Sequence, residues 1–185
     1  MSFRLVIETV DTPIFGGTVW LGGWRLRNAD RIIAEKRSDP FDAQLGHHDK
    51  GLYPVILEAM KAVPAGSEVR IICRSRYLVT EINRPSAHRI ATGYLKTNGK
   101  PLSEVSLLRQ IDEVTAAKSL VISAAPPETD NDHRDSSEIR VQLDLLKEDV
   151  GKKPGWRYWC GKLSCGSFAK PLKEPKPQTD LRAVA

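Results

Sequence analysis

The stretch GYLKTNGKPLSEVSLLRQID, residues 93–112, joins a loop rich in lysine and glycine to a helical pattern. The loop carries Lys96 and Lys100. After it, apolar side chains recur three positions apart, at Leu102, Val105, Leu108 and Ile111. This spacing places side chains on one face of a helix. The stretch therefore predicts a basic loop followed by a helix with one buried face.

Three segments typical of β-strands open the chain. Apolar residues alternate along residues 3–8, and two further β-rich segments follow at 18–27 and 31–37. An Asn-Ala-Asp turn separates the last two, which predicts a hairpin. The pair Gly22-Gly23 inside the second segment predicts a bulge or the close approach of another backbone. Together these segments predict an antiparallel meander of three strands.

Helices and strands alternate after the meander. The predicted order begins with a helix over residues 52–63, a buried strand over 68–74 and a short helix over 76–83 with Ser75 as its N-cap. A loop over 85–101 and the helix after that loop come next. A strand over 119–124 follows, and then a last helix after a polar segment over 130–137. This order predicts an α/β fold. Its core is a mixed five-stranded sheet of three antiparallel and two further strands, flanked by helices.

Three local matches resemble the type 1 ribonuclease H family, over about residues 3–150. Residues 93–112 are similar to the family's basic loop and following helix. Ser75-Arg76-Tyr77 is similar to its aspartate-serine-x-tyrosine turn, and NDHRD, residues 131–135, resembles the asparagine-x-x-x-aspartate start of its last helix. The resemblance implies a ribonuclease H-like fold and a ribonuclease H-like domain over residues 1–150.

The remaining residues, 151–185, form a basic C-terminal tail. They contain six Lys and two Arg against two acidic residues, a net charge of +6, which leaves −1 on residues 1–150. Four prolines predict little regular structure in this tail. Its aromatic part, with Trp156, Trp159 and Phe168, is expected to pack on the domain or on a protein partner, and the rest is expected to be partly disordered.

The resemblance implies a metal site that this sequence departs from. In the family, four carboxylates hold two divalent cations that act on a phosphodiester. The positions that match these four carboxylates hold Val10, Leu52, Arg74 and Asp135. Their formal charge is zero. We expect Arg74 to form a bidentate salt bridge with Asp135 in place of the metal centre. The prediction is a catalytically inactive pseudo-nuclease without a metal or other cofactor.

The basic loop implies a partner. In the family this region grips the backbone of the duplex, and phosphate contacts of this kind do not need the metal centre. The residues expected to bind nucleic acid, an RNA–DNA hybrid or a duplex, are Arg76, Arg84, His88, Arg89, Lys96 and Lys100. A loop that is merely solvated remains the alternative.

Two other functions stay open. One is an active, Mg²⁺-dependent hybrid endonuclease with a rearranged carboxylate set drawn from Glu8, Asp11, Glu58, Asp132 and Asp135. The other is a protein-interaction scaffold that docks through the aromatic part of the tail. The charge of −1 on residues 1–150 favours the scaffold, because nucleic-acid binders usually carry a basic face on the domain itself.

The composition predicts the kind of cellular compartment in which the protein is found. The sequence has no apolar run of about 18 residues, which argues against a transmembrane helix and a membrane partner. Its three cysteines do not suggest a disulfide framework. A reducing compartment, the cytoplasm, is therefore predicted.

Overall fold

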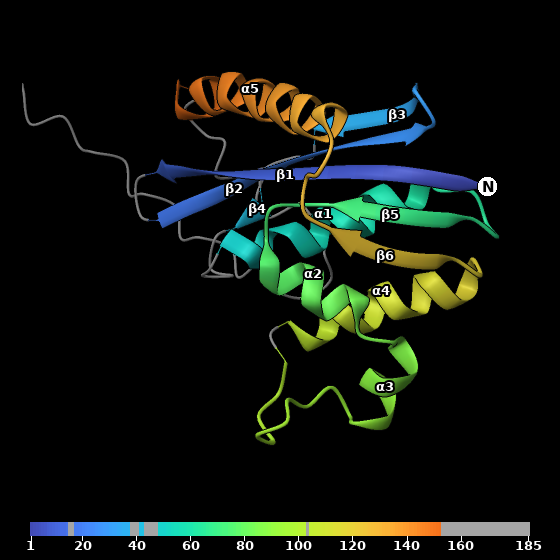
Figure 1. Ribbon diagram of the computed structural model, residues 1–185. Helices are drawn as coiled ribbons and strands as arrows, with labels where there is room; N and C mark the ends of the chain where they lie inside the picture. The colour runs from blue at the N-terminus through green and yellow to red at the C-terminus, as the bar shows by residue number, and fades with distance from the viewer. Residues whose placement is uncertain (15–16, 38–40, 43–47, 103, 153–185) are drawn as a thin grey trace, which may run out of the picture.

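A computed structural model describes residues 1–14, 17–37, 41–42, 48–102 and 104–152 (Figure 1). The predictions for the tail beyond Lys152, including Trp156, Trp159 and Phe168, lie outside the described residues. In chain order the elements are β1 (Ser2–Ile14), β2 (Gly17–Asn28), β3 (Arg31–Arg37), β4 (Phe41–Asp42), α1 (His48–Ala62), β5 (Glu68–Ile72), α2 (Arg76–Asn83), α3 (Ser86–Ala91), α4 (Val105–Ala117), β6 (Val121–Ala125) and α5 (Asp130–Lys152). The predicted domain boundary at residue 150 falls inside α5.

The strands form one mixed sheet in the order β3-β2-β1-β5-β6. β1, β2 and β3 are antiparallel neighbours, whereas β5 pairs in parallel with β1 and with β6. This confirms the predicted meander followed by two further strands. The short strand β4 was not predicted. It pairs with Val19 and Trp20 of β2 and is not part of the strand order given above.

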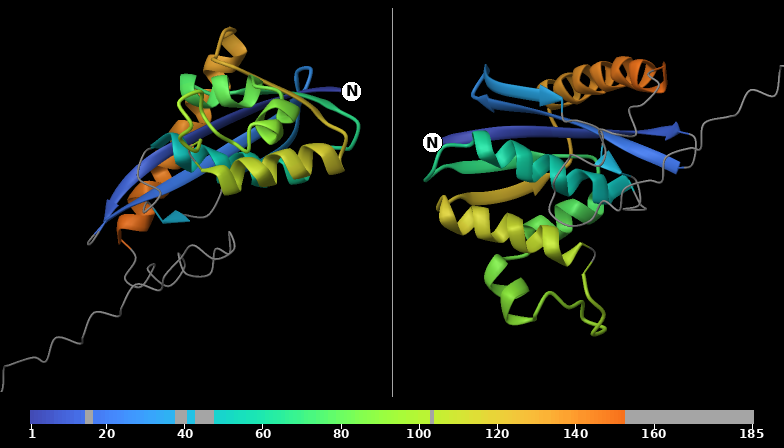
Figure 2. Two further views of the ribbon diagram at one scale, coloured as in Figure 1. Left: turned by 90° about the horizontal axis from the view of Figure 1, so that it is seen from below. Right: turned by 180° about the vertical axis from the view of Figure 1, so that it is seen from behind.

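Helices cover both faces of the sheet. α5 lies on one face, and α1 and α4 lie on the other (Figures 1 and 2). The alternation along β1 divides its side chains between two cores: Leu5 and Ile7 pack with α1 and α4, while Val6 and Val10 pack with Ile139 and Leu143 of α5. No helix in the described ranges is long and apolar enough to cross a membrane.

The segment predicted as a loop over residues 85–101 contains a helix, α3. Its six residues are too few to show helical periodicity in the sequence. Pro85 is its N-cap, and the Pro85 carbonyl accepts hydrogen bonds from the backbone N–H groups of His88 and Arg89, at 3.0 and 3.1 Å. The prediction of an N-cap at Ser75 is confirmed, since its Oγ accepts a hydrogen bond from the N–H of Leu78 at 3.1 Å.

The last helix begins at Asp130. This agrees with the resemblance of residues 131–135 to the start of the family's last helix, whereas the prediction of a polar segment over 130–137 before the helix is wrong. Thr129 Oγ1 accepts a hydrogen bond from the N–H of Asp132 at 3.2 Å, and Asp132 Oδ2 accepts one from the N–H of Thr129 at 3.1 Å. This reciprocal pair has the geometry of a capping box, with Asp in place of Glu. The polar segment is therefore the first turns of α5, not a loop before it.

α5 approaches the backbone of β2 closely at Gly23. A Cβ atom added at Gly23 would lie 2.8 Å from Ile139 Cγ2. The neighbouring atoms belong to side chains of α5 and not to another backbone, so the close approach is found in this form, and it explains why a side chain is excluded at Gly23. The register shift between β2 and β3 occurs elsewhere, between Leu26 and Arg27.

Replacing Gly23 with Ala is expected to lower the free energy of unfolding by about 1–3 kcal/mol, because the new methyl group overpacks the contact with α5. The measurement is urea denaturation of G23A and of G23A in an Ile139→Leu background. Leucine lacks the γ2 methyl group, so the substitution should cost less there. An equal cost in both backgrounds would show that the Ile139 contact does not exclude the side chain.

Candidate functional site

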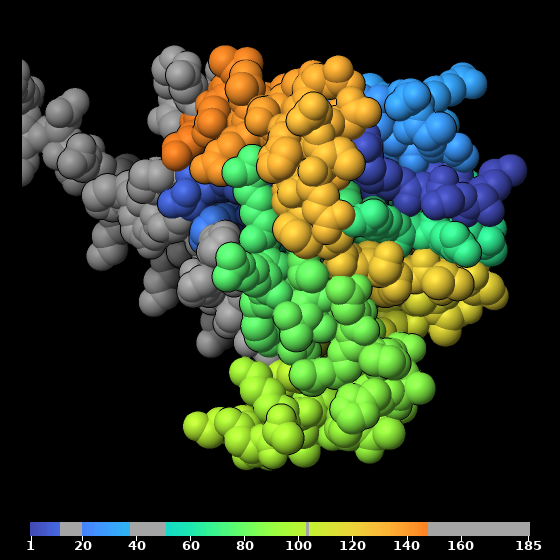
Figure 3. Space-filling view, in the orientation of Figure 1, coloured from blue at the N-terminus to red at the C-terminus, as the bar shows by residue number. Residues whose placement is uncertain are grey.

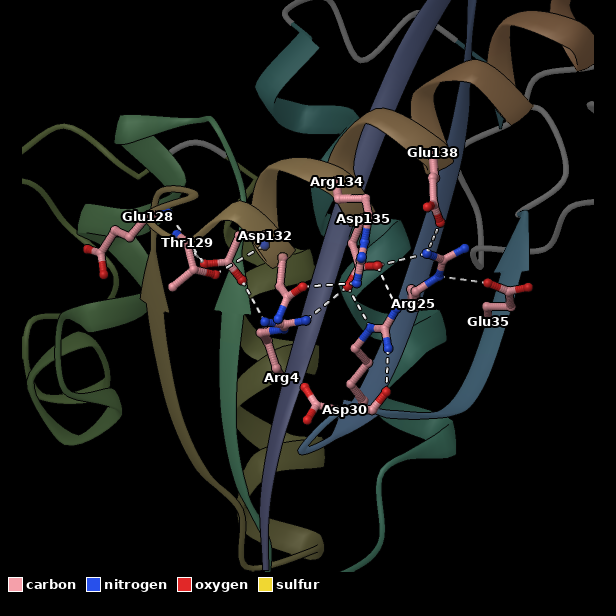
Figure 4. Close-up of polar contacts among 12 residues, drawn as sticks. Arg4, Arg25, Asp30, Glu35, Glu128, Thr129, Asp132, Arg134, Asp135 and Glu138 are labelled. Carbon is pink, nitrogen blue, oxygen red and sulfur yellow. Dashed lines mark hydrogen bonds and ion pairs between the residues drawn. The ribbon is translucent and has the colours of Figure 1, made fainter.

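Asp135, the one matched carboxylate, is fully buried between α5 and the sheet, and three arginines surround it (Figure 4). Its Oδ1 accepts hydrogen bonds from Arg25 Nη1 and Arg27 Nη2, both at 2.8 Å. Its Oδ2 accepts from Arg27 Nε at 2.7 Å and from Arg4 Nη2 at 3.0 Å. We call these four residues the Asp135 cluster.

Strand geometry explains why the three arginines meet. Arg25 and Arg27 are two residues apart on β2 and so share a face, and Arg27 pairs directly with Arg4 of β1. Side chains of such cross-strand neighbours project to the same side of the sheet. All three therefore point toward α5, where Asp135 receives them.

Further acidic groups balance the arginines. Arg25 Nε donates to Glu35 Oε2 at 2.7 Å, Arg25 Nη1 donates to Glu138 Oε2 at 2.5 Å, and Arg4 Nη1 lies 3.2 Å from Asp132 Oδ1. Burial by itself raises the pKa of Asp135, but the hydrogen bonds and charges of Arg27 and Arg25 outweigh it and hold this pKa below its ordinary value. Asp135 is thus an ionised, saturated acceptor.

The predicted salt bridge between Arg74 and Asp135 is wrong. Arg74 Nε instead lies 3.3 Å from Glu8 Oε1 and 3.2 Å from Ser136 Oγ, to both of which it donates. A helix turns by about 100° per residue, so Asp135 and Ser136 face different strands. Asp135 points toward β2 and its arginines, whereas Ser136 points toward the end of β5.

The other matched positions contribute no metal ligand. Val10 is buried in the core beneath α5, and Leu52 is buried in the core on the other face of the sheet. Arg74 is a cation, and both oxygens of Asp135 already bind arginines. Divalent cations require several free oxygen ligands. This set of residues does not fit the pair of metal ions that the family resemblance implies.

The alternative acids are spread over the fold. Glu8 is buried beside Arg74, Asp11 is exposed on β1, and Asp132 caps α5. Glu58, on α1, accepts a hydrogen bond from Lys36 of β3 at 2.6 Å. In the described part of the chain, no group of three or more His, Cys, Asp or Glu side chains could hold a metal ion.

The second predicted site is the basic segment from Arg84 to Lys100. Residues 84–102, here called the handle, contain this segment and project from the domain (Figures 1 and 3). The prediction that Arg89 contacts a ligand is wrong, because this side chain is 1% exposed. Arg89 forms a bidentate pair with Asp112 of α4, its Nε donating to Oδ2 at 3.0 Å. Asp112 Oδ2 also accepts the hydroxyl of Tyr94 at 3.0 Å.

This buried pair fastens the handle to the domain. Arg89 Nη1 donates to the backbone carbonyls of Glu81, at 2.6 Å, and of Arg84. One guanidinium therefore joins α2, α3 and α4. The sequence contained no signal for this role, because an arginine in a basic segment looks the same whether it faces solvent or a buried carboxylate 23 residues away.

The remaining predicted contacts reach the surface. Arg76, His88 and Lys100 are exposed, and Arg84 and Lys96 are half-buried. Lys96 Nζ lies 5.9 Å from the ring centroid of Tyr77, which brings the tip of the handle next to the start of α2, where Arg76 lies. Arg84 is 3.7 Å from Glu81. Arg76, Lys96 and Lys100 are thus the cations that the fold places best for a ligand.

No family model and no curated protein matches this sequence. Solved structures do match its fold. The ribonuclease H domain of prototype foamy virus is 16% identical, with a TM-score of 0.54 over 80% of this chain and 94% of that one. LC9-RNase H1, a type 1 RNase H with the type 2 active-site motif, is 11% identical, with a TM-score of 0.54 over 94% of this chain and 88% of that one.

A third match is the foamy viral protease-reverse transcriptase, solved in complex with double-stranded DNA. It is 15% identical, with a TM-score of 0.53 over 81% of this chain and 90% of that one. Likeness at these identities establishes the fold. The chain is an α/β protein with a ribonuclease H-like fold, as the three sequence matches predicted.

Replacing Asp135 with Asn should lower the free energy of unfolding at pH 7 by about 3–5 kcal/mol, since it leaves buried arginines without their counter-ion. The folded-state pKa of Asp135 lies below its ordinary value of 3.8. Its contribution is therefore fully present above pH 3.8 and is lost as pH falls through the folded-state pKa. The measurement is denaturation of D135N and of the wild type at several pH values. The difference between their free energies of unfolding should become smaller below pH 3.8.

The control for this experiment is Asp144→Asn, the same chemical change at an exposed position on α5. It should alter the free energy of unfolding by no more than about 0.5 kcal/mol. A D135N protein as stable as D144N would contradict the assignment of Asp135 as a buried counter-ion.

Replacing Arg89 with Leu should destabilise the handle, because Asp112 is left buried without its cation, at a cost of about 3–5 kcal/mol. Hydrogen exchange should accelerate in α3 and over residues 94–102 more than in the sheet. Arg84→Leu is the control, since Arg84 makes a looser contact with Glu81. Unchanged exchange in R89L would refute the proposed fastening role.

Proposed function

We propose that this protein binds the sugar-phosphate backbone of a duplex or an RNA–DNA hybrid through its handle and the start of α2, and that it does not cleave the nucleic acid. The observation that carries the proposal is the pairing of Lys96 with Tyr77. This contact brings Lys96 next to Arg76, and the backbone hydrogen bond from the Lys96 N–H to the Lys100 carbonyl, at 2.7 Å, keeps Lys100 beside Lys96.

The chemistry of these residues supports backbone binding. Lysine and arginine neutralise phosphates and release counter-ions without reading sequence. The buried pair of Arg89 with Asp112 holds the segment that carries the lysines, so little conformational entropy is lost on binding. A foamy viral protein of the same fold has been solved with double-stranded DNA, which is consistent with such a partner.

The lack of cleavage is proposed from the matched active-site positions. A two-metal mechanism needs carboxylates with free oxygens. Val10 and Leu52 offer none, Arg74 is a cation, and Asp135 is saturated by Arg4, Arg25 and Arg27.

Binding of the full chain to a labelled DNA duplex and to a hybrid should weaken steeply with salt. In the double variant K96Q/K100Q the slope of log K against log salt should become shallower by about 1 for each lost phosphate contact. Lys61→Gln is the control, because Lys61 is exposed on α1 and lies beside Lys118 at the C-terminal end of α4, whereas the handle precedes the other end of α4. Absence of binding by the wild type, or equal loss in K61Q, would overturn the proposed function.

Incubation of the full chain with a hybrid and Mg²⁺ or Mn²⁺ should give no cleavage above background. The informative comparison is with Glu8→Gln, which alters the buried acid closest to the matched positions. Cleavage by the wild type that is lost in a folded E8Q protein would establish an active nuclease with a rearranged carboxylate set.

A further inference from the structure

Arg74 follows the carboxyl end of β5 and lies beside Glu8 in the middle of β1, since Ile72 of β5 pairs with Val6 of β1. Its side chain is 51% exposed, although it contacts two buried groups. Nε donates to Glu8 Oε1 at 3.3 Å, and both Nε and Nη2 donate to Ser136 Oγ at 3.2 Å. Glu8 and Ser136 thus hold one edge of the guanidinium while the rest reaches solvent.

The outer part of this guanidinium is available for a ligand. Among the described residues, Nη1 of Arg74 has no hydrogen-bond or ion-pair partner. The same guanidinium is fixed on its inner edge, so it would lose little freedom when an anion binds. A planar fork of this kind matches the oxygens of a phosphate.

The charges around Arg74 favour an anion. Within the part of the chain that the structure describes, Glu8 is the one acidic contact of Arg74. Glu8 also interacts with Arg140, which lies one turn after Ser136 on α5. Burial raises the pKa of Glu8, whereas the hydrogen bond from Ser136 and the charges of Arg74 and Arg140 act in the opposite direction. Two arginines therefore share one carboxylate, which leaves excess positive charge.

This position is continuous with the handle. Arg76, exposed two residues after Arg74, begins α2, and Tyr77 carries the contact with Lys96. Figure 1 shows α2 between the end of β5 and the handle. A nucleic-acid backbone that follows the handle toward the sheet would meet Arg76 and then Arg74.

We propose that Arg74 binds a backbone phosphate of the nucleic acid, and that Glu8 and Ser136 are positioning residues that aim its guanidinium. The inference rests on the proposed function and deepens it by adding a contact at the centre of the fold. The ligand class is a phosphodiester.

The test is the affinity of the full chain for a labelled DNA duplex at several salt concentrations. Arg74→Gln should weaken binding several-fold and make the salt slope shallower by about 1. The matched control is Arg70→Gln: Arg70 lies on β5, four residues before Arg74, with the same 51% exposure, but its guanidinium is paired with Glu128 at 2.5 Å. R70Q should bind like the wild type.

Glu8→Gln separates positioning from simple charge. This change removes a negative charge, so a purely electrostatic role for the region predicts tighter binding. If Glu8 aims Arg74, binding by E8Q should weaken despite the gain in positive charge, and Ser136→Ala should weaken it in the same direction. Circular dichroism of each variant is the check that it is folded. Tighter or unchanged binding by E8Q would overturn the positioning role.

The outcomes distinguish this inference from the proposed function. If the wild type binds, K96Q/K100Q weakens binding, and R74Q matches R70Q, the handle binds nucleic acid and the Arg74 inference is overturned. If the wild type does not bind the duplex, the proposed function is overturned, and the inference about Arg74, which rests on it, is overturned with it.

Discussion

The buried charge of Asp135 is the constraint on which the arrangement of the site depends. A carboxylate removed from water must be compensated, and Arg4, Arg25 and Arg27 provide this from two adjacent strands. The geometry is possible only if the first turns of α5 lie directly over β1 and β2. Gly23 permits the same approach, because it places no side chain between the helix and the sheet. Charge pairing and backbone packing therefore specify the same position for α5.

The same chemistry recurs at the other end of the molecule, in the handle. Asp112 receives Arg89 and Tyr94 in the interior, and this carboxylate ties a peripheral segment to α4. The two networks have different consequences for a ligand. The Asp135 cluster uses its arginines internally, whereas burial of Arg89 leaves Lys96 and Lys100 outside on a fastened segment. A basic composition alone does not distinguish these uses of positive charge.

Parts of the candidate site were predictable and parts were not. The mismatch of Val10, Leu52 and Arg74 with a carboxylate site was evident from residue types alone. Arg25 and Arg27 stand two residues apart on a predicted strand. This spacing could have predicted that their side chains lie on the same face of the sheet. Nothing in the sequence indicated that Glu8, a residue of β1, and Ser136, a residue of α5, hold the same guanidinium.

The sequence by itself determined the order of the elements apart from β4 and α3, the meander, the two-sided sheet and the cap at Ser75, because these follow from periods and turns within about ten residues. Tertiary structure decided which charges meet. Asp135 lies 131 positions from Arg4 and 108 from Arg27, so only the packing of α5 on the sheet brings them together. The tertiary structure also decided that Arg89 is buried and that Arg74 is half-exposed. The burial of a side chain depends on the elements packed around it and not on its neighbours in the chain.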